Sequence, residues 1–201
     1  SADCVPAKQG CDSNDRKRRL RRHYQMKRGS KNRITARLLA VCALFAAAAA
    51  ILSVTESAIP QLLPVPGAKL GLANAVTVFC LYRLPKARWA ALVLAVRIAL
   101  GGLYTGPFPM LYSAVGGFAA FFTELMLKRA VRSDLRLIFL VSAIGGAAHN
   151  AVSLAFASGV ARSGSLFYYL PWLLAIGIAS GAAIGLLVEL VIRRLPPKLK
   201  N

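Results

Sequence analysis

Five residues that could bind a ligand lie within otherwise apolar stretches of the sequence. Lys69 and Asn74 stand at the start of one apolar run, and Arg97 lies near the middle of another. His149 and Asn150 are adjacent and lie well inside a third. Ionisable groups within a membrane are costly and usually face a cavity or a partner. Because arginine and lysine bind carboxylate, phosphate and diphosphate groups, these residues predict a site for an anionic ligand.

Each of these residues also has a structural interpretation. Lys69 lies close to the start of its run and could extend its side chain to the membrane interface. Arg97 could form a structural ion pair, since an arginine at mid-membrane costs at least ~2.5 kcal/mol unless it is paired or hydrated. A lone histidine such as His149 is more often a hydrogen-bonded core residue than a catalyst. From the sequence, both interpretations stay open.

Composition places these residues in a membrane protein. The chain has 201 residues, of which 57% are hydrophobic, and its mean hydropathy is +0.55. The 26 basic residues outnumber the 7 acidic ones and give a net charge of +19. An excess of basic residues as large as this is typical of proteins that bind nucleic acid. Here the basic residues gather in the N-terminal tail and in short gaps between apolar runs, which is typical of a polytopic membrane protein.

Six apolar segments predict an all-α protein, a compact bundle of six transmembrane helices. They are residues 34–54, 67–84, 89–104, 110–127, 137–157 and 166–192. We therefore expect a transmembrane domain over 34–195, after a basic, disordered cytoplasmic tail at 1–33 and before a short basic tail at 196–201. The N-terminal tail could bind nucleic acid, contact anionic lipid or help to set topology. Its position just before a membrane helix favours the last two.

Charge predicts the orientation of the bundle. The tails and the gaps at 83–88 and 128–136 are basic, whereas the connectors at 55–66, 104–109 and 158–165 contain a single basic residue, Arg162. The positive-inside rule then places both termini in the cytoplasm. Glu56, Tyr104 and Tyr112 would border the outer mouth of the site. Glu124 would lie near the cytoplasmic interface, where it could pair with Lys128.

Several chemistries are not predicted. The sequence has no GxxxxGK[ST] phosphate loop, no paired metal-binding carboxylates and no Gly-x-Ser-x-Gly motif. We therefore expect no enzymatic activity, no metal and no cofactor in this chain alone. Cys42 and Cys80 lie in apolar runs and are expected to be core residues. Cys4 and Cys11 are expected to be free thiols.

The first apolar segment has a stripe of small residues at helical spacing. Steps of four and three residues place Ala36, Ala40, Ala43 and Ala47 on one face. Small residues let two helices approach closely in lipid. The stripe could serve ordinary packing within the bundle or dock a separate membrane subunit.

The motifs around Lys69 resemble a known family. Glu56, Pro60, the string Pro66-Gly-Ala-Lys-Leu-Gly-Leu-Ala-Asn74, Arg97 and the pair Gly116-Gly117 resemble the Gx transporter family, also labelled heptaprenyl diphosphate synthase component I. The resemblance covers about residues 34–195. The family looks similar to the substrate-binding S components of energy-coupling factor transporters, which are six-helix proteins of the bacterial cell membrane.

The resemblance implies an uptake component that binds a small, anionic molecule such as a vitamin, a flavin or an isoprenoid-related compound. Its partners would be a scaffold transmembrane subunit, docked on the alanine stripe, and cytoplasmic ATPases. The site would comprise Lys69, Asn74, Arg97, His149 and Asn150, with the connector 55–66 as an outer lid.

The enzyme label suggests other roles. Prenyl diphosphate synthases hold magnesium and diphosphate with DDxxD motifs, and this chain has none. A non-catalytic membrane partner of a polyprenyl diphosphate synthase is therefore one alternative. A structural subunit of a membrane flavin or quinone redox complex is another.

Overall fold

The computed structural model describes residues 16–18, 36–56, 71–131 and 134–195. The chain divides into two units, Ser1–Val41 and Cys42–Asn201. Within the first unit, the described residues 16–18 are helical, and a longer helix begins at Ala36. Lys69, Cys4, Cys11 and most of the connector 55–66 lie outside the described residues, so the predictions for them stay predictions.

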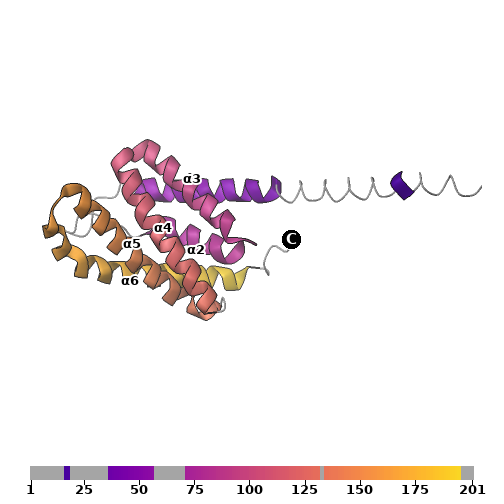
Figure 1. Ribbon diagram of the computed structural model, residues 1–201. Helices are drawn as coiled ribbons and strands as arrows, with labels where there is room; N and C mark the ends of the chain where they lie inside the picture. The colour runs from indigo at the N-terminus through magenta and orange to yellow at the C-terminus, as the bar shows by residue number, and fades with distance from the viewer. Residues whose placement is uncertain (1–15, 19–35, 57–70, 132–133, 196–201) are drawn as a thin grey trace, which may run out of the picture. The chain divides into compact units, whose positions relative to one another are not determined.

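The described residues form helices and contain no strand (Figure 1). The first long helix is Ala36–Glu56. It is followed by α2 (Leu72–Arg83), α3 (Ala87–Thr105), α4 (Pro107–Ala130), the short η1 (Leu135–Leu137), α5 (Ile138–Ala161), η2 (Gly164–Tyr169) and α6 (Leu170–Arg194). Five of these helical segments are long and apolar enough to cross a membrane. The predicted all-α membrane fold is confirmed.

The second predicted span is shorter than expected. Residues 67–84 were predicted as a full span, but the helix α2 has 12 residues and begins at Leu72. At 1.5 Å per residue it is about 18 Å long, against a hydrocarbon core of about 30 Å. Gly71 precedes it with φ 76°, a left-handed conformation that favours glycine. Gly71 therefore belongs to a turn that precedes the helix.

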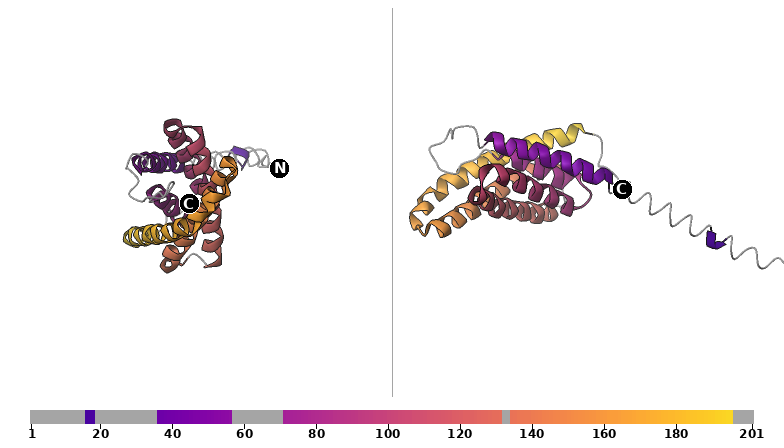
Figure 2. Two further views of the ribbon diagram at one scale, coloured as in Figure 1. Left: turned by 90° about the vertical axis from the view of Figure 1, so that its left-hand side faces the viewer. Right: turned by 90° about the horizontal axis from the view of Figure 1, so that it is seen from above.

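Helices α5 and α6 pack closely because glycines line their contact. A side chain on Gly146 of α5 would collide with the carbonyl oxygen of Gly177 on α6. One on Gly181 would collide with the carbonyl oxygen of Ser142. Figures 1 and 2 show the two helices side by side. The glycines therefore let the two helix backbones approach closely, with Gly146 and Gly177 against each other.

The short helix α2 is the most enclosed element of the second unit. Thr77, Val78, Cys80 and Leu81 are buried, and a side chain on Gly71 would lie 3.4 Å from Ile184 Cδ1 of α6. Cys42 and Cys80 are buried free thiols, as predicted. By contrast, large apolar side chains are exposed on the other helices, for example Leu44, Leu103 and Phe122. Such a surface suits contact with lipid, and the protein is a multi-pass membrane protein.

Candidate functional site

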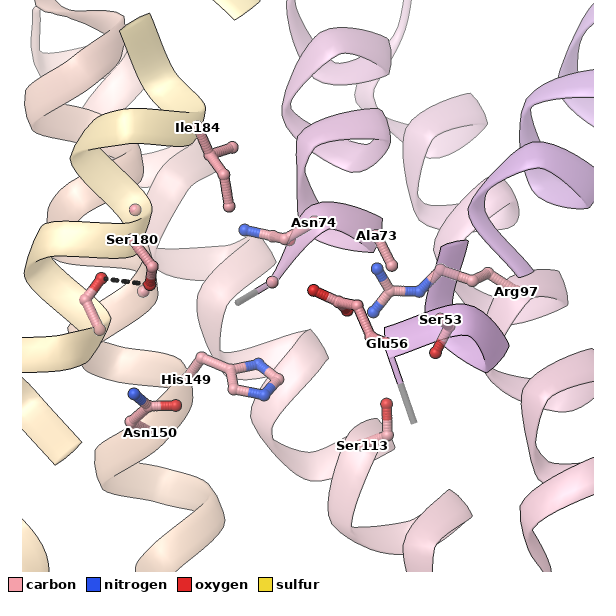
Figure 3. Close-up of a pocket in the computed structure, with 14 residues that line it drawn as sticks. Ser53, Glu56, Ala73, Asn74, Arg97, Ser113, His149, Asn150, Ser180 and Ile184 are labelled. Atoms are coloured by element: carbon pink, nitrogen blue, oxygen red, sulfur yellow. Dashed lines mark hydrogen bonds between the residues drawn. The ribbon is translucent and has the colours of Figure 1, made fainter. Parts of the chain in front are cut away.

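A cavity lies at the start of α2, enclosed by the helix Ala36–Glu56 and by α2 to α6 (Figure 3). About 60 Å³ of it is open to the centres of water molecules. This is room for several waters, since one water needs roughly 10–15 Å³ by this measure. The charged and basic groups that line it are Glu56, Arg97 and His149, each from a different helix. The cavity is therefore a polar pocket within a bundle that is apolar outside.

The turn before α2 brings a carboxylate to the helix N-terminus. The backbone N–H of Leu72, the first residue of α2, donates to Oε1 of Glu56 at 2.7 Å. The free N–H groups at a helix start carry partial positive charge and attract anions. Glu56 thus occupies the position where an anionic ligand would otherwise be favoured, and it ties the end of the first long helix to the start of α2.

Arg97 is the buried cation of the cavity. Its side chain is 5% exposed, and its Nη1 atom has no hydrogen-bond partner among the described residues. Glu56 and Glu124 both attract the guanidinium electrostatically. Figure 3 shows the Glu56 and Arg97 side chains pointing toward each other across the cavity. A buried guanidinium with an unused donor can bind an anion that enters this space.

Glu124 lies deeper in the bundle than the sequence suggested. It is fully buried on α4, and its Oε1 accepts a hydrogen bond of 2.9 Å from Asn74 Nδ2 of α2. Its Oε2 has no hydrogen-bond partner among the residues described. Gly145 makes room for it, since a side chain there would lie 2.5 Å from Oε1. The structure therefore places Glu124 inside the bundle with Asn74 as a partner, and its predicted position near the cytoplasmic interface stays a prediction.

Lys128 of α4 contacts the end of α2. Its Nζ donates to the carbonyl oxygen of Leu81 at 2.6 Å and lies 4.8 Å from the centre of the Tyr82 ring. Helix α2 ends two residues after Leu81, so its last carbonyl groups lack partners within the helix. Lys128 satisfies one of them and so links α4 to the end of α2.

His149 and Asn150 of α5 reach the cavity from neighbouring positions. The Nδ2 of Asn150 donates to the Leu173 carbonyl oxygen of α6 at 2.7 Å, so its amide also joins the two helices. The His149 ring packs over Gly116 of α4, where an added side chain would lie 3.0 Å from Cε1. Figure 3 shows the imidazole directed into the space between Asn74 and Ser113.

The structure places most of the predicted site residues around one cavity. Glu56, Asn74, Arg97, His149 and Asn150 all line this one cavity. Tyr104 is 71% exposed, and neither it nor Tyr112 is among the described lining residues. The alanines of the predicted docking face are exposed: Ala36, Ala40, Ala43 and Ala47. Binding of a ligand or of a partner by these residues stays a prediction.

The sequence reasoning missed three serines that line the cavity: Ser53, Ser113 and Ser180. Serine is common in membrane helices, so its presence alone carries little information. For two of the serines, the position in the sequence could have indicated a place in the site. Ser53 lies three residues before Glu56, and Ser180 lies between Gly177 and Gly181 on the glycine face of α6. Their hydroxyl groups can donate to an anion as well as accept.

Comparison with known proteins gives a family and no individual relative. Residues 45–191 match the sequence model of a family described as heptaprenyl diphosphate synthase component I. No curated protein and no solved structure matches the chain. The matched range contains the cavity residues from Ser53 to Ile184.

Proposed function

The chain belongs to the heptaprenyl diphosphate synthase component I family, and we propose that it is a membrane subunit that binds a small anionic molecule. Specifically, it is the substrate-binding component of an uptake transporter of the energy-coupling-factor type. The ligand enters the cavity at the start of α2 and pairs with Arg97. Transport is driven by separate subunits, a membrane scaffold and cytoplasmic ATPases.

The observation that carries this proposal is the state of Arg97. A guanidinium that is 5% exposed has an unused donor atom in a polar cavity. Burying a charge in this way is costly unless a partner completes its hydrogen bonds. An incoming carboxylate or phosphate supplies such a partner. Ser113 and His149 line other sides of the same space.

Thermal stabilisation by anions tests the binding role. A ligand that binds the folded state raises the melting temperature. We expect some members of a panel of carboxylates, phosphates and diphosphates to stabilise the wild-type protein, and to lose this effect in Arg97→Ala. Arg97→Lys keeps the charge but loses the planar fork of donors and should retain part of the effect. Arg162→Gly is the matched control.

Arg162 suits that control for a physical reason. It is an exposed cation on a predicted outer connector, and its φ of 48° favours glycine, so the substitution removes charge without adding strain. If no anion stabilises the wild type, or if Arg97→Ala responds as the wild type does, the binding role at Arg97 is wrong.

The family description favours a second candidate function. It names a component of a heptaprenyl diphosphate synthase, and a non-catalytic membrane partner of such an enzyme is the second candidate. Affinity purification of the tagged chain from its native membrane separates the two. Co-purified ATPases and a scaffold subunit support transport, whereas a co-purified chain with DDxxD motifs supports the synthase partner.

A further inference from the structure

Glu56 and Arg97 carry opposite charges into the polar cavity but do not pair with each other. Their side chains point toward each other from the end of the first long helix and from α3 (Figure 3). Among the described residues they form no ion pair, and Nη1 of Arg97 has no hydrogen-bond partner. The cavity therefore presents a carboxylate and a guanidinium that a bound molecule could contact together.

The cavity has the size of a small molecule. The 60 Å³ open to the centres of water molecules hold roughly four to six waters. A ligand with about as many non-hydrogen atoms fills this space. Gly146, Gly177 and Gly181 line one wall and touch backbone atoms of the facing helix. That wall has no side chains that could turn aside to admit a larger ligand.

Glu56 is held in place by the start of α2. Its Oε1 accepts the hydrogen bond from the Leu72 N–H at 2.7 Å. A carboxylate can accept about four hydrogen bonds, so this one leaves most of its capacity unused. The side chain is half-buried at the edge of the cavity. Glu56 is thus a fixed acceptor that suits an ammonium group of a ligand.

A ligand with only negative charge meets an obstacle in this cavity. Glu56 and Glu124 already attract Arg97, and a further carboxylate beside Glu56 would be repelled by it. An ammonium group on the same ligand turns this repulsion into attraction. Because the cavity is partly buried, water weakens either interaction less than it would at the surface.

We infer that the ligand is a small zwitterion, of the size of a small amino acid, whose carboxylate binds Arg97 and whose ammonium group binds Glu56. The inference rests on the proposed binding of an anionic group at Arg97 and adds the second charge of the ligand. Glu56 is then the residue that selects a zwitterion over a simple anion.

Calorimetric titration of the purified protein tests the inference with pairs of probes of similar shape. Glycine, β-alanine and γ-aminobutyrate carry an ammonium group where propionate, butyrate and valerate carry a methyl group. We expect at least one zwitterion to bind about tenfold or more tightly than its methyl counterpart, because hydrogen bonds between charged groups are the strong ones. This comparison requires only the wild-type protein.

Substitution of Glu56 tests the origin of the preference. Glu56→Gln removes the charge and keeps an oxygen that can accept from the Leu72 N–H. We expect the zwitterion to lose its advantage, while its methyl counterpart binds at least as tightly as before because the repulsion is gone. Glu189→Gln is the matched control, since Glu189 pairs with Arg193 on α6 and is not among the residues lining the cavity. It should leave the preference intact.

The outcomes separate this inference from the proposed function. Equal affinities within all three pairs overturn the inference, and so does a preference that survives Glu56→Gln. If phosphates or diphosphates bind through Arg97 but none of the six probes binds, the inference fails and anion binding at Arg97 stands. If no anion and no zwitterion binds the wild-type protein, both proposals fail.

Discussion

At the scale of single residues, the site depends on buried charges that neutralise one another only in part. Arg97 is attracted by Glu56 and by Glu124, yet one nitrogen of Arg97 and one oxygen of Glu124 have no hydrogen-bond partner among the described residues. Buried polar atoms without hydrogen-bond partners lower the stability of the folded protein. A protein that retains them gains something else, and ligand binding is the explanation that we favour.

The hydrogen bond between Asn74 and Glu124 can be tested by a double-mutant cycle. We expect Asn74→Ala and Glu124→Ala each to lower the free energy of unfolding, and the two losses to be non-additive by about 1 kcal/mol, because both remove the same bond. Unfolding in mixed micelles provides the measurement. Strictly additive losses would contradict the bond of 2.9 Å seen here.

Glu124→Gln separates the shape of this side chain from its charge. The amide oxygen of glutamine can still accept from Asn74, and the neutral amide is less costly to bury than a carboxylate. We expect the variant to be at least as stable as the wild type. A loss as large as that of Glu124→Ala would show instead that the charge of Glu124 stabilises the bundle.

At the scale of elements, the cavity exists because α2 is short and because α5 and α6 pack through glycine. The start of α2 lies within the bundle, so its N-terminus faces other helices and its first N–H meets Glu56. The close contact of α5 with α6 brings the Asn150 amide within reach of the Leu173 carbonyl oxygen.

Two glycines of α5 give a matched test of this packing. Gly146→Ala drives a methyl group into the backbone of Gly177, so we expect it to lower the free energy of unfolding by about 1–3 kcal/mol. Gly159 has no atom within 4 Å of an added side chain. Gly159→Ala should leave stability unchanged or raise it by up to about 1 kcal/mol. Equal effects of the two substitutions would contradict the packing role.

Docking of a scaffold subunit on the alanine face of the first long helix can be tested by substitution. Ala43 and Ala47 are exposed, whereas Cys42, Ala46 and Ala49 of the same helix are buried. Replacing Ala40 and Ala47 with leucine should abolish co-purification of a scaffold subunit while the protein still folds. Ala48→Leu, also on an exposed position, is the control. Normal co-purification of the double variant would refute docking through this face.

At the scale of the whole molecule, hydropathy predicted the elements well because the membrane requires long apolar helices. It failed at residues 67–84, where the left-handed turn at Gly71 shortens the helix without a change in hydropathy. Five predicted site residues meet in one cavity because polar groups in apolar helices turn inward. Glu124 can be buried because Gly145 of α5 leaves room for its carboxylate. A single sequence does not show which residues of two helices will face each other in this way.

The central claim is that Arg97 binds an anionic ligand, and native mass spectrometry of the purified protein tests it most directly. Protein released gently from its membrane should carry a bound small molecule with an anionic group. This mass should be absent from Arg97→Ala and present in the control Arg162→Gly. The same bound molecule at the same occupancy in all three proteins would contradict the claim.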